Sequence, residues 1–217
     1  MKQHIIYFIL AAGMGLFSTH SALSSQDATV TIRVHDVLDK PVGDAVVTLH
    51  PAQAAKAPKQ RPQAIMVQRD MTFEPHVLAI PKGTEVWFPN EDDFRHHIYS
   101  FSQAKQFEVR LYGGDEEKRV TFNTAGIVAL GCNIHDSMLA YIYVADTPYV
   151  RKSDDTGRVE FLTVSPGDYT VSIWHPRMER RTGSVSQTIK VDDKGAVEKT
   201  IAVALKREKK KSRKKRY

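Results

Sequence analysis

The sequence has very little cysteine, because Cys132 is the only one among 217 residues. A single cysteine cannot form a disulfide within its own chain, so this is not a disulfide-stabilised scaffold. Long apolar runs are also scarce: only residues 5–17 form one, and it is shorter than the roughly 18–20 residues that span a membrane. No segment shows sustained helical periodicity, which leaves strands and turns as the expected structure.

The N-terminus has the layout of a secretory signal peptide. Lys2 gives a positive start, the apolar run 5–17 follows, and residues 18–26 are rich in small side chains. We place cleavage after Ser24, so that residues 1–24 are removed, with an uncleaved anchor as the alternative. The layout favours export to a bacterial periplasm. In an oxidising compartment an odd cysteine pairs with another chain, stays a free thiol or binds a metal.

The positive charge of the chain is concentrated at its C-terminus. The formal net charge is +6, but residues 206–217 alone carry nine Lys or Arg and one Glu, a net of +8, so the rest of the chain carries −2. Such a block is typical of a disordered, solvated tail. We expect weak contact between this tail and anionic surfaces, or alternatively an arm for an acidic partner. Nucleic acid is not an expected partner of an exported protein.

The body of the chain reads as many short strands. Apolar and polar residues alternate in 28–34, and a second apolar segment follows at 45–51. Residues 52–63 lack periodicity and are interpreted as a linker. From residue 64 to 146 short strand patterns recur with turn signals between them. The expected fold class is therefore all-β, built as a sandwich or barrel.

Two further segments carry the motifs of one module. Residues 154–176 contain an Asp-Asp-Thr-Gly turn, an alternating strand and a Pro-Gly-Asp-Tyr turn into the next strand, and residues 30–49 match the first half of the same pattern. This pattern resembles the carboxypeptidase regulatory-like, or transthyretin-like, β-sandwich. The resemblance implies one sandwich split into 27–55 and 147–205, with the block 64–146 inserted in it or docked on it. Two independent units in tandem are the alternative.

The segment Gly-Cys-Asn-Ile-His-Asp-Ser-Met at 131–138 places three metal-binding side chains in one loop. The Cys132 thiolate, the His135 imidazole and the Met138 thioether are donors that select copper over magnesium or calcium. A trigonal His₂Cys site with an axial Met needs a second histidine, and the candidates are His96 and His97. Because neighbours on a strand point to opposite faces, only one of the two can face the site.

With these residues in view, the block 64–146 resembles the cupredoxins, Greek-key β-sandwiches that hold one type 1 copper. Asn90 precedes His96, and Gly126 precedes Cys132, at the family's spacings. The resemblance implies that the ligands are His96, Cys132, His135 and Met138. His97 stands where the family commonly has a bracing Asn. His97 and Asn90 are therefore each expected either as an alternative ligand or as a brace beside the ligands.

The resemblance also implies a function. A cupredoxin carries single electrons between redox protein partners and is not an enzyme. The loop histidine His135 is expected at an apolar docking patch, for which the candidates are Phe94, Pro89 and Leu139. The alternative is a copper-binding module for delivery, sensing or docking on an enzyme. Zinc would suit these ligands less well, because methionine is an unusual zinc ligand.

Overall fold

A computed structural model describes most of the chain, namely residues 27–53, 62–135, 137–179, 183–193 and 195–207. Within these ranges the regular structure consists of seventeen β-strands, which confirms the all-β prediction. No helix in the described ranges is long and apolar enough to cross a membrane. The predicted signal peptide, most of the predicted linker and the basic tail beyond residue 207 lie outside the described residues and stay predictions.

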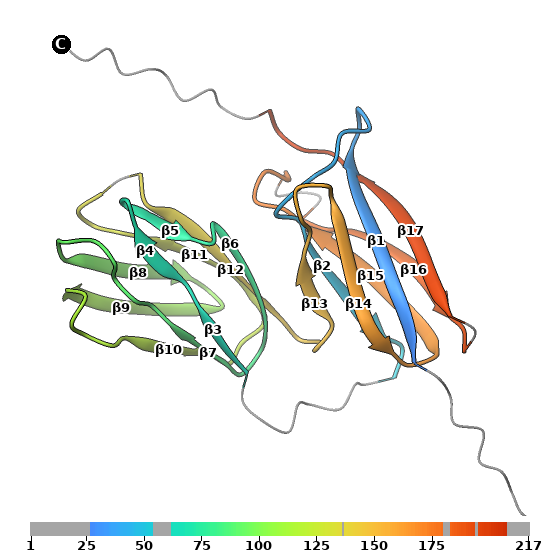
Figure 1. Cartoon of the computed structure of the whole chain (residues 1–217), viewed down its shortest axis with the longest axis horizontal. Helices are drawn as coiled ribbons and strands as arrows, with labels where there is room; N and C mark the ends of the chain where they lie inside the picture. Colours follow the sequence, from blue (N-terminus) through green and yellow to red (C-terminus); the bar gives the residue numbers. More distant parts are fainter. Residues whose placement is uncertain (1–26, 54–61, 136, 180–182, 194, 208–217) are drawn as a thin grey trace, which may run out of the picture.

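The strands form two units that lie side by side (Figure 1). We call residues 62–146 the central unit, and residues 27–53 with 147–207 the terminal unit. Strands β4 and β5 form a separate two-stranded hairpin in the central unit.

The terminal unit is built from strands at both ends of the chain. Strand β1 pairs antiparallel with β14 and parallel with β17, while β2 lies between β13 and β15 in a second sheet. One apolar core lies between the two sheets, and alternate residues of β1, such as Val30 and Ile32, are fully buried in it. The predicted resemblance of this unit to the carboxypeptidase regulatory-like module is not tested by the strand arrangement and stays a prediction. Its strands are β1 (Ala28–Asp36), β2 (Val46–Pro51), β13 (Val150–Lys152), β14 (Arg158–Val164), β15 (Gly167–Trp174), β16 (Val185–Val191) and β17 (Ala196–Val203).

The central unit has a five-stranded sheet in the order β6-β12-β11-β8-β9 and a three-stranded sheet in the order β10-β7-β3. Its buried core contains large side chains such as Phe88, Phe122 and Ile142, and it also contains Cys132 and Met138. Its strands are β3 (Gln63–Ile65), β4 (Val67–Arg69), β5 (Thr72–Glu74), β6 (Val77–Pro81), β7 (Thr84–Trp87), β8 (His96–Ser102), β9 (Lys105–Tyr112), β10 (Arg119–Phe122), β11 (Gly126–Gly131) and β12 (Leu139–Ala145).

A small apolar cluster joins the two units. Trp174 at the end of β15 is buried, and its ring lies 5.7 Å from that of Tyr141 and 5.6 Å from that of Tyr143, both on β12. Val46 of the terminal unit and Val77 of the central unit belong to the same cluster. Strand β12 therefore links the Cys132–Met138 loop with the contact to the terminal unit. It buries Ala140, Ile142 and Val144 on one side, and the partly buried Tyr141 and Tyr143 contact Trp174 on the other.

We expect Trp174→Ala to destabilise the protein by about 3–5 kcal/mol, because truncating a buried aromatic leaves a cavity that the two sheets cannot close. Chemical denaturation of the full chain, followed by circular dichroism, measures this change. Leu162→Ala is the control, since Leu162 is 57% exposed on β14. Equal stability of the two variants would show that the cluster does not hold the units together.

Candidate metal centre

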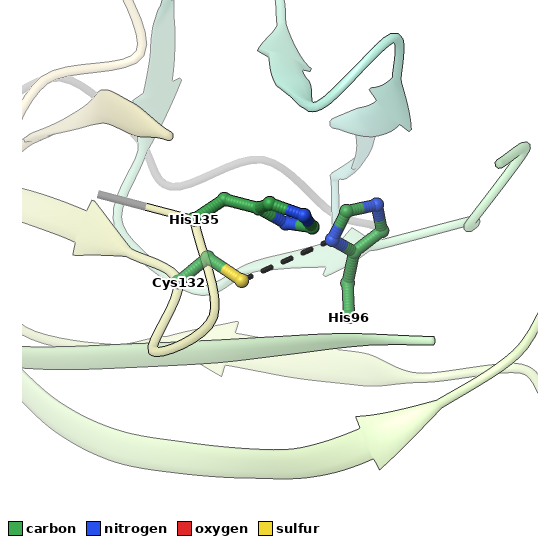
Figure 2. A group of neighbouring side chains, drawn as sticks. All are labelled: His96, Cys132 and His135. Atoms are coloured by element: carbon green, nitrogen blue, oxygen red, sulfur yellow. Dashed lines mark hydrogen bonds between the residues drawn. The ribbon is translucent and has the colours of Figure 1, made fainter. Parts of the chain in front are cut away.

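The β8 strand and the loop from β11 to β12 bring three candidate ligands together (Figure 2). His96 is the first residue of β8, Cys132 follows directly after β11, and His135 lies in the loop that leads to β12. Because β11 pairs antiparallel with both β8 and β12, this loop and the start of β8 meet at one end of the sheet. One ligand atom from each of the three residues lies within 4.8 Å of the others.

Cys132 and His96 are buried and His135 is partly exposed, and their facing atoms have few partners outside the group. Cys132 is a free, buried thiol, and its Sγ lies 3.9 Å from Nδ1 of the fully buried His96. Nδ1 of His135 is buried and has no hydrogen-bond partner among the described residues. An unpaired buried polar atom is unfavourable by about 1–3 kcal/mol, so such an atom is expected to have a partner. One thiolate and two imidazoles facing one point fit a copper ion well.

Met138 lies in the core directly after the loop. Its side chain is only 2% exposed and belongs to the same buried cluster as Cys132. Its backbone N–H donates to the carbonyl oxygen of His135 at 3.0 Å, which closes a turn between the two residues. The thioether is therefore held on the inner side of the loop that carries Cys132 and His135.

The structure brings His96 into the cluster and turns His97 away from it. Nε2 of His97 lies 2.8 Å from Oε1 of Glu108 on β9, and its ring packs against Tyr99 at 5.8 Å. Both histidines are buried, but on opposite faces of β8, as the alternation of a strand requires. His97 thus contacts the neighbouring strand and lies outside the donor group.

Asn90 organises the loop before β8 and does not join the donor group. Its Nδ2 donates to the carbonyl oxygens of Phe94 at 2.8 Å and Tyr112 at 3.0 Å. Its Oδ1 accepts from the backbone N–H of Asp92 at 3.0 Å. Asn90 therefore acts as a brace, because its hydrogen bonds hold the loop that ends at His96.

Asp92 is a site residue that the sequence reasoning missed. Its Oδ2 lies 2.7 Å from Nε2 of His96, on the side of the ring opposite Cys132. Burial raises the pKa of Asp92, but hydrogen bonds from His96 and from the backbone of Met71 and Asp70 outweigh it, so the pKa lies below its usual value. The carboxylate is therefore ionised at neutral pH. The one signal for Asp92 in the sequence is its position four residues before His96, a candidate ligand.

Apolar side chains lie at the surface beside the cluster. Phe94 is 43% exposed, and its ring lies 5.0 Å from that of His96 and 5.5 Å from that of His135. Ile134, inside the loop, and Leu139, directly after it, are also about half exposed. Pro89, the third expected patch residue, is partly buried, and its carbonyl oxygen accepts from Gln68 at 2.9 Å.

No protein-family model and no curated protein matches the chain. Solved structures similar to part of it include a copper-containing nitrite reductase from Thermus scotoductus, which is 31% identical over 44% of this chain and 25% of that one, with a TM-score of 0.37. They also include a purple cupredoxin from Nitrosopumilus maritimus, 21% identical over 38% of this chain and 99% of that one, with a TM-score of 0.35.

An amicyanin from Paracoccus versutus is likewise similar, at 21% identity over 46% of this chain and 97% of that one, with a TM-score of 0.35. The chain spans about a quarter of the length of the nitrite reductase and nearly all of the purple cupredoxin and of the amicyanin. These similarities cover less than half of this chain, and it is the donor atoms themselves that indicate a metal.

The two adjacent histidines give a direct test of the donor group. We expect His96→Ala to lower copper affinity by more than the roughly 10–100-fold that loss of an outer-shell partner causes, because a donor atom is removed. His97→Ala is the matched control and should change the affinity by less than about tenfold. Competition with a chelator measures both affinities. The reverse order of effects would assign the metal to His97.

Proposed function

We propose that the chain is a cupredoxin that binds one type 1 copper and carries single electrons. Cys132, His96 and His135 would hold the copper, and the thioether of Met138 would be a fourth, weaker donor. The observation that carries the proposal is the convergence of one free thiol and two imidazoles within 4.8 Å at the end of one sheet.

The ligand set defines the chemistry, because copper bound by a thiolate and two imidazoles supplies a one-electron couple. The chain itself holds the donors in fixed positions. His96 is anchored by the start of β8, and Cys132 by the end of β11, while the loop turn from His135 to Met138 is closed by a backbone hydrogen bond. Donors held this firmly move little when the charge of the site changes, which favours outer-sphere electron transfer.

Burial of Cys132 and His96 favours a carrier over a delivery protein. A protein that hands over its metal needs ligands that a receiving protein can reach. Here Cys132 is 4% exposed and His96 is fully buried. Electron transfer needs only a short path to the surface, and the exposed ring of Phe94 contacts both imidazoles. We therefore propose that redox proteins dock over Phe94 and Leu139, in the periplasm to which the predicted signal peptide directs the chain.

The proposal predicts an intense visible absorption band from thiolate-to-copper charge transfer in the oxidised protein, and its reversible loss on one-electron reduction. Cys132→Ser should abolish the band, because a hydroxyl oxygen cannot replace the thiolate as charge donor. Absorption spectroscopy through repeated redox cycles measures both effects. A colourless copper(II) complex of the wild-type protein would contradict the type 1 assignment.

A further inference from the structure

We propose that Asp92 is a positioning residue for the copper site, and that the turn of the β4–β5 hairpin holds Asp92 in place. The inference rests on the proposed function, because it assigns a role toward the metal that His96 is proposed to bind. In this arrangement the carboxylate orients the imidazole of His96, and the hairpin forms an outer layer behind the carboxylate.

The Asp92 carboxylate is surrounded by three hydrogen-bond donors. Oδ1 accepts from the backbone N–H of Asp70 at 2.8 Å. Oδ2 accepts from the backbone N–H of Met71 at 3.1 Å and contacts Nε2 of His96 at 2.7 Å. The Asp92 side chain is 9% exposed, and that of His96 is fully buried. A carboxylate fits this place because it accepts on both oxygens and carries no donor of its own.

This contact selects one tautomer of His96. A carboxylate that already accepts two backbone N–H groups can only accept from the imidazole, so the ring proton lies on Nε2. Nδ1 is then left with its lone pair, and it is the atom that faces Cys132 Sγ at 3.9 Å. The second nitrogen of a metal-binding histidine is commonly held in this way, which fixes both the tautomer and the ring orientation.

The hairpin turn is shaped to bind the carboxylate. Asp70 and Met71 form the two-residue connection between β4 and β5, and both have positive φ, 51° and 55°. Two-residue hairpins favour this conformation, although residues other than Gly or Asn adopt it at some cost. Asp92 takes both of the successive N–H groups of this turn, in the manner of an anion bound by backbone amides.

Further contacts tie the hairpin to the loop that carries Asp92. The Gln68 N–H donates to the carbonyl oxygen of Pro89, and the Glu91 N–H donates to that of Gln68, both at 2.9 Å. The Arg69 guanidinium also pairs with the Glu91 carboxylate. The hairpin therefore cannot shift without disturbing the loop, and the loop fixes the carboxylate against His96.

The negative charge has a second consequence at the site. A carboxylate in contact with a ligand imidazole makes that ligand a stronger donor and stabilises the more positive metal state. For copper it therefore favours Cu(II) over Cu(I) and lowers the reduction potential. Asp92→Asn removes this charge. The amide that replaces the carboxylate has a single acceptor oxygen, so it cannot accept from His96 and from both backbone N–H groups of the hairpin turn.

The test compares Asp92→Asn with Asp93→Asn in the full chain. Asp93 is the next residue in the sequence and is exposed. Its variant therefore removes one negative charge close to the site but leaves the contact between Asp92 and His96 in place. We expect Asp92→Asn to lower Cu(II) affinity by about 10–100-fold and to raise the midpoint potential. Asp93→Asn should stay close to wild type in both. Equal changes in the two variants would overturn the positioning role, because they would show a general charge effect.

A measurement on the metal-free protein separates this inference from the copper proposal. Nitrogen-15 NMR of the imidazoles should show His96 with its proton on Nε2 in the wild type, and a mixture of tautomers in Asp92→Asn. A wild-type proton on Nδ1 would overturn the positioning role, and this readout needs no variant to fold. A fixed Nε2–H tautomer beside a colourless copper complex would support the positioning role and contradict the type 1 proposal.

Discussion

The antiparallel pairing of β11 with β8 and β12 is the constraint on which the site depends. Gly131 at the end of β11 pairs with Tyr99 on β8 and with Leu139 on β12. This register places the Cys132–Met138 loop over the start of β8, where His96 lies. Because side chains alternate along a strand, the same register sends His96 toward the loop and His97 toward Glu108 on β9. A shift of one residue would exchange the two histidines.

Two sets of contacts hold this register in place. On one side, β12 buries Ala140, Ile142 and Val144 in the core of the central unit, so the strand after the loop is fixed by packing. On its other side, Tyr141 and Tyr143 meet Trp174 of the terminal unit. The loop thus leads into a strand that is packed on both faces, and this packing limits the movement of the donor side chains that the loop carries.

The sequence predicted the local part of the site better than the long-range part. Cys132, His135 and Met138 lie in one loop, so their spacing alone grouped them, and strand patterns predicted the all-β fold. The choice between His96 and His97 depends on register, which local spacing does not define. For Asp92 the sequence offers only its position four residues before His96, because its other partners are the backbone N–H groups of Asp70 and Met71, in a hairpin more than twenty residues earlier. Likewise, the pairing of β1 with β17 joins residues 28–36 to 196–203, and no local pattern specifies it.

The proposed function requires one copper ion bound by one thiolate and two imidazoles. X-ray absorption at the copper edge of the loaded, oxidised protein can detect this ligand set, because the scattering distinguishes sulfur from nitrogen neighbours. We expect one short copper–sulfur bond and two imidazole nitrogens, with the short sulfur contribution absent in Cys132→Ser. A shell made only of nitrogen and oxygen in the wild-type protein would rule out Cys132 as a ligand.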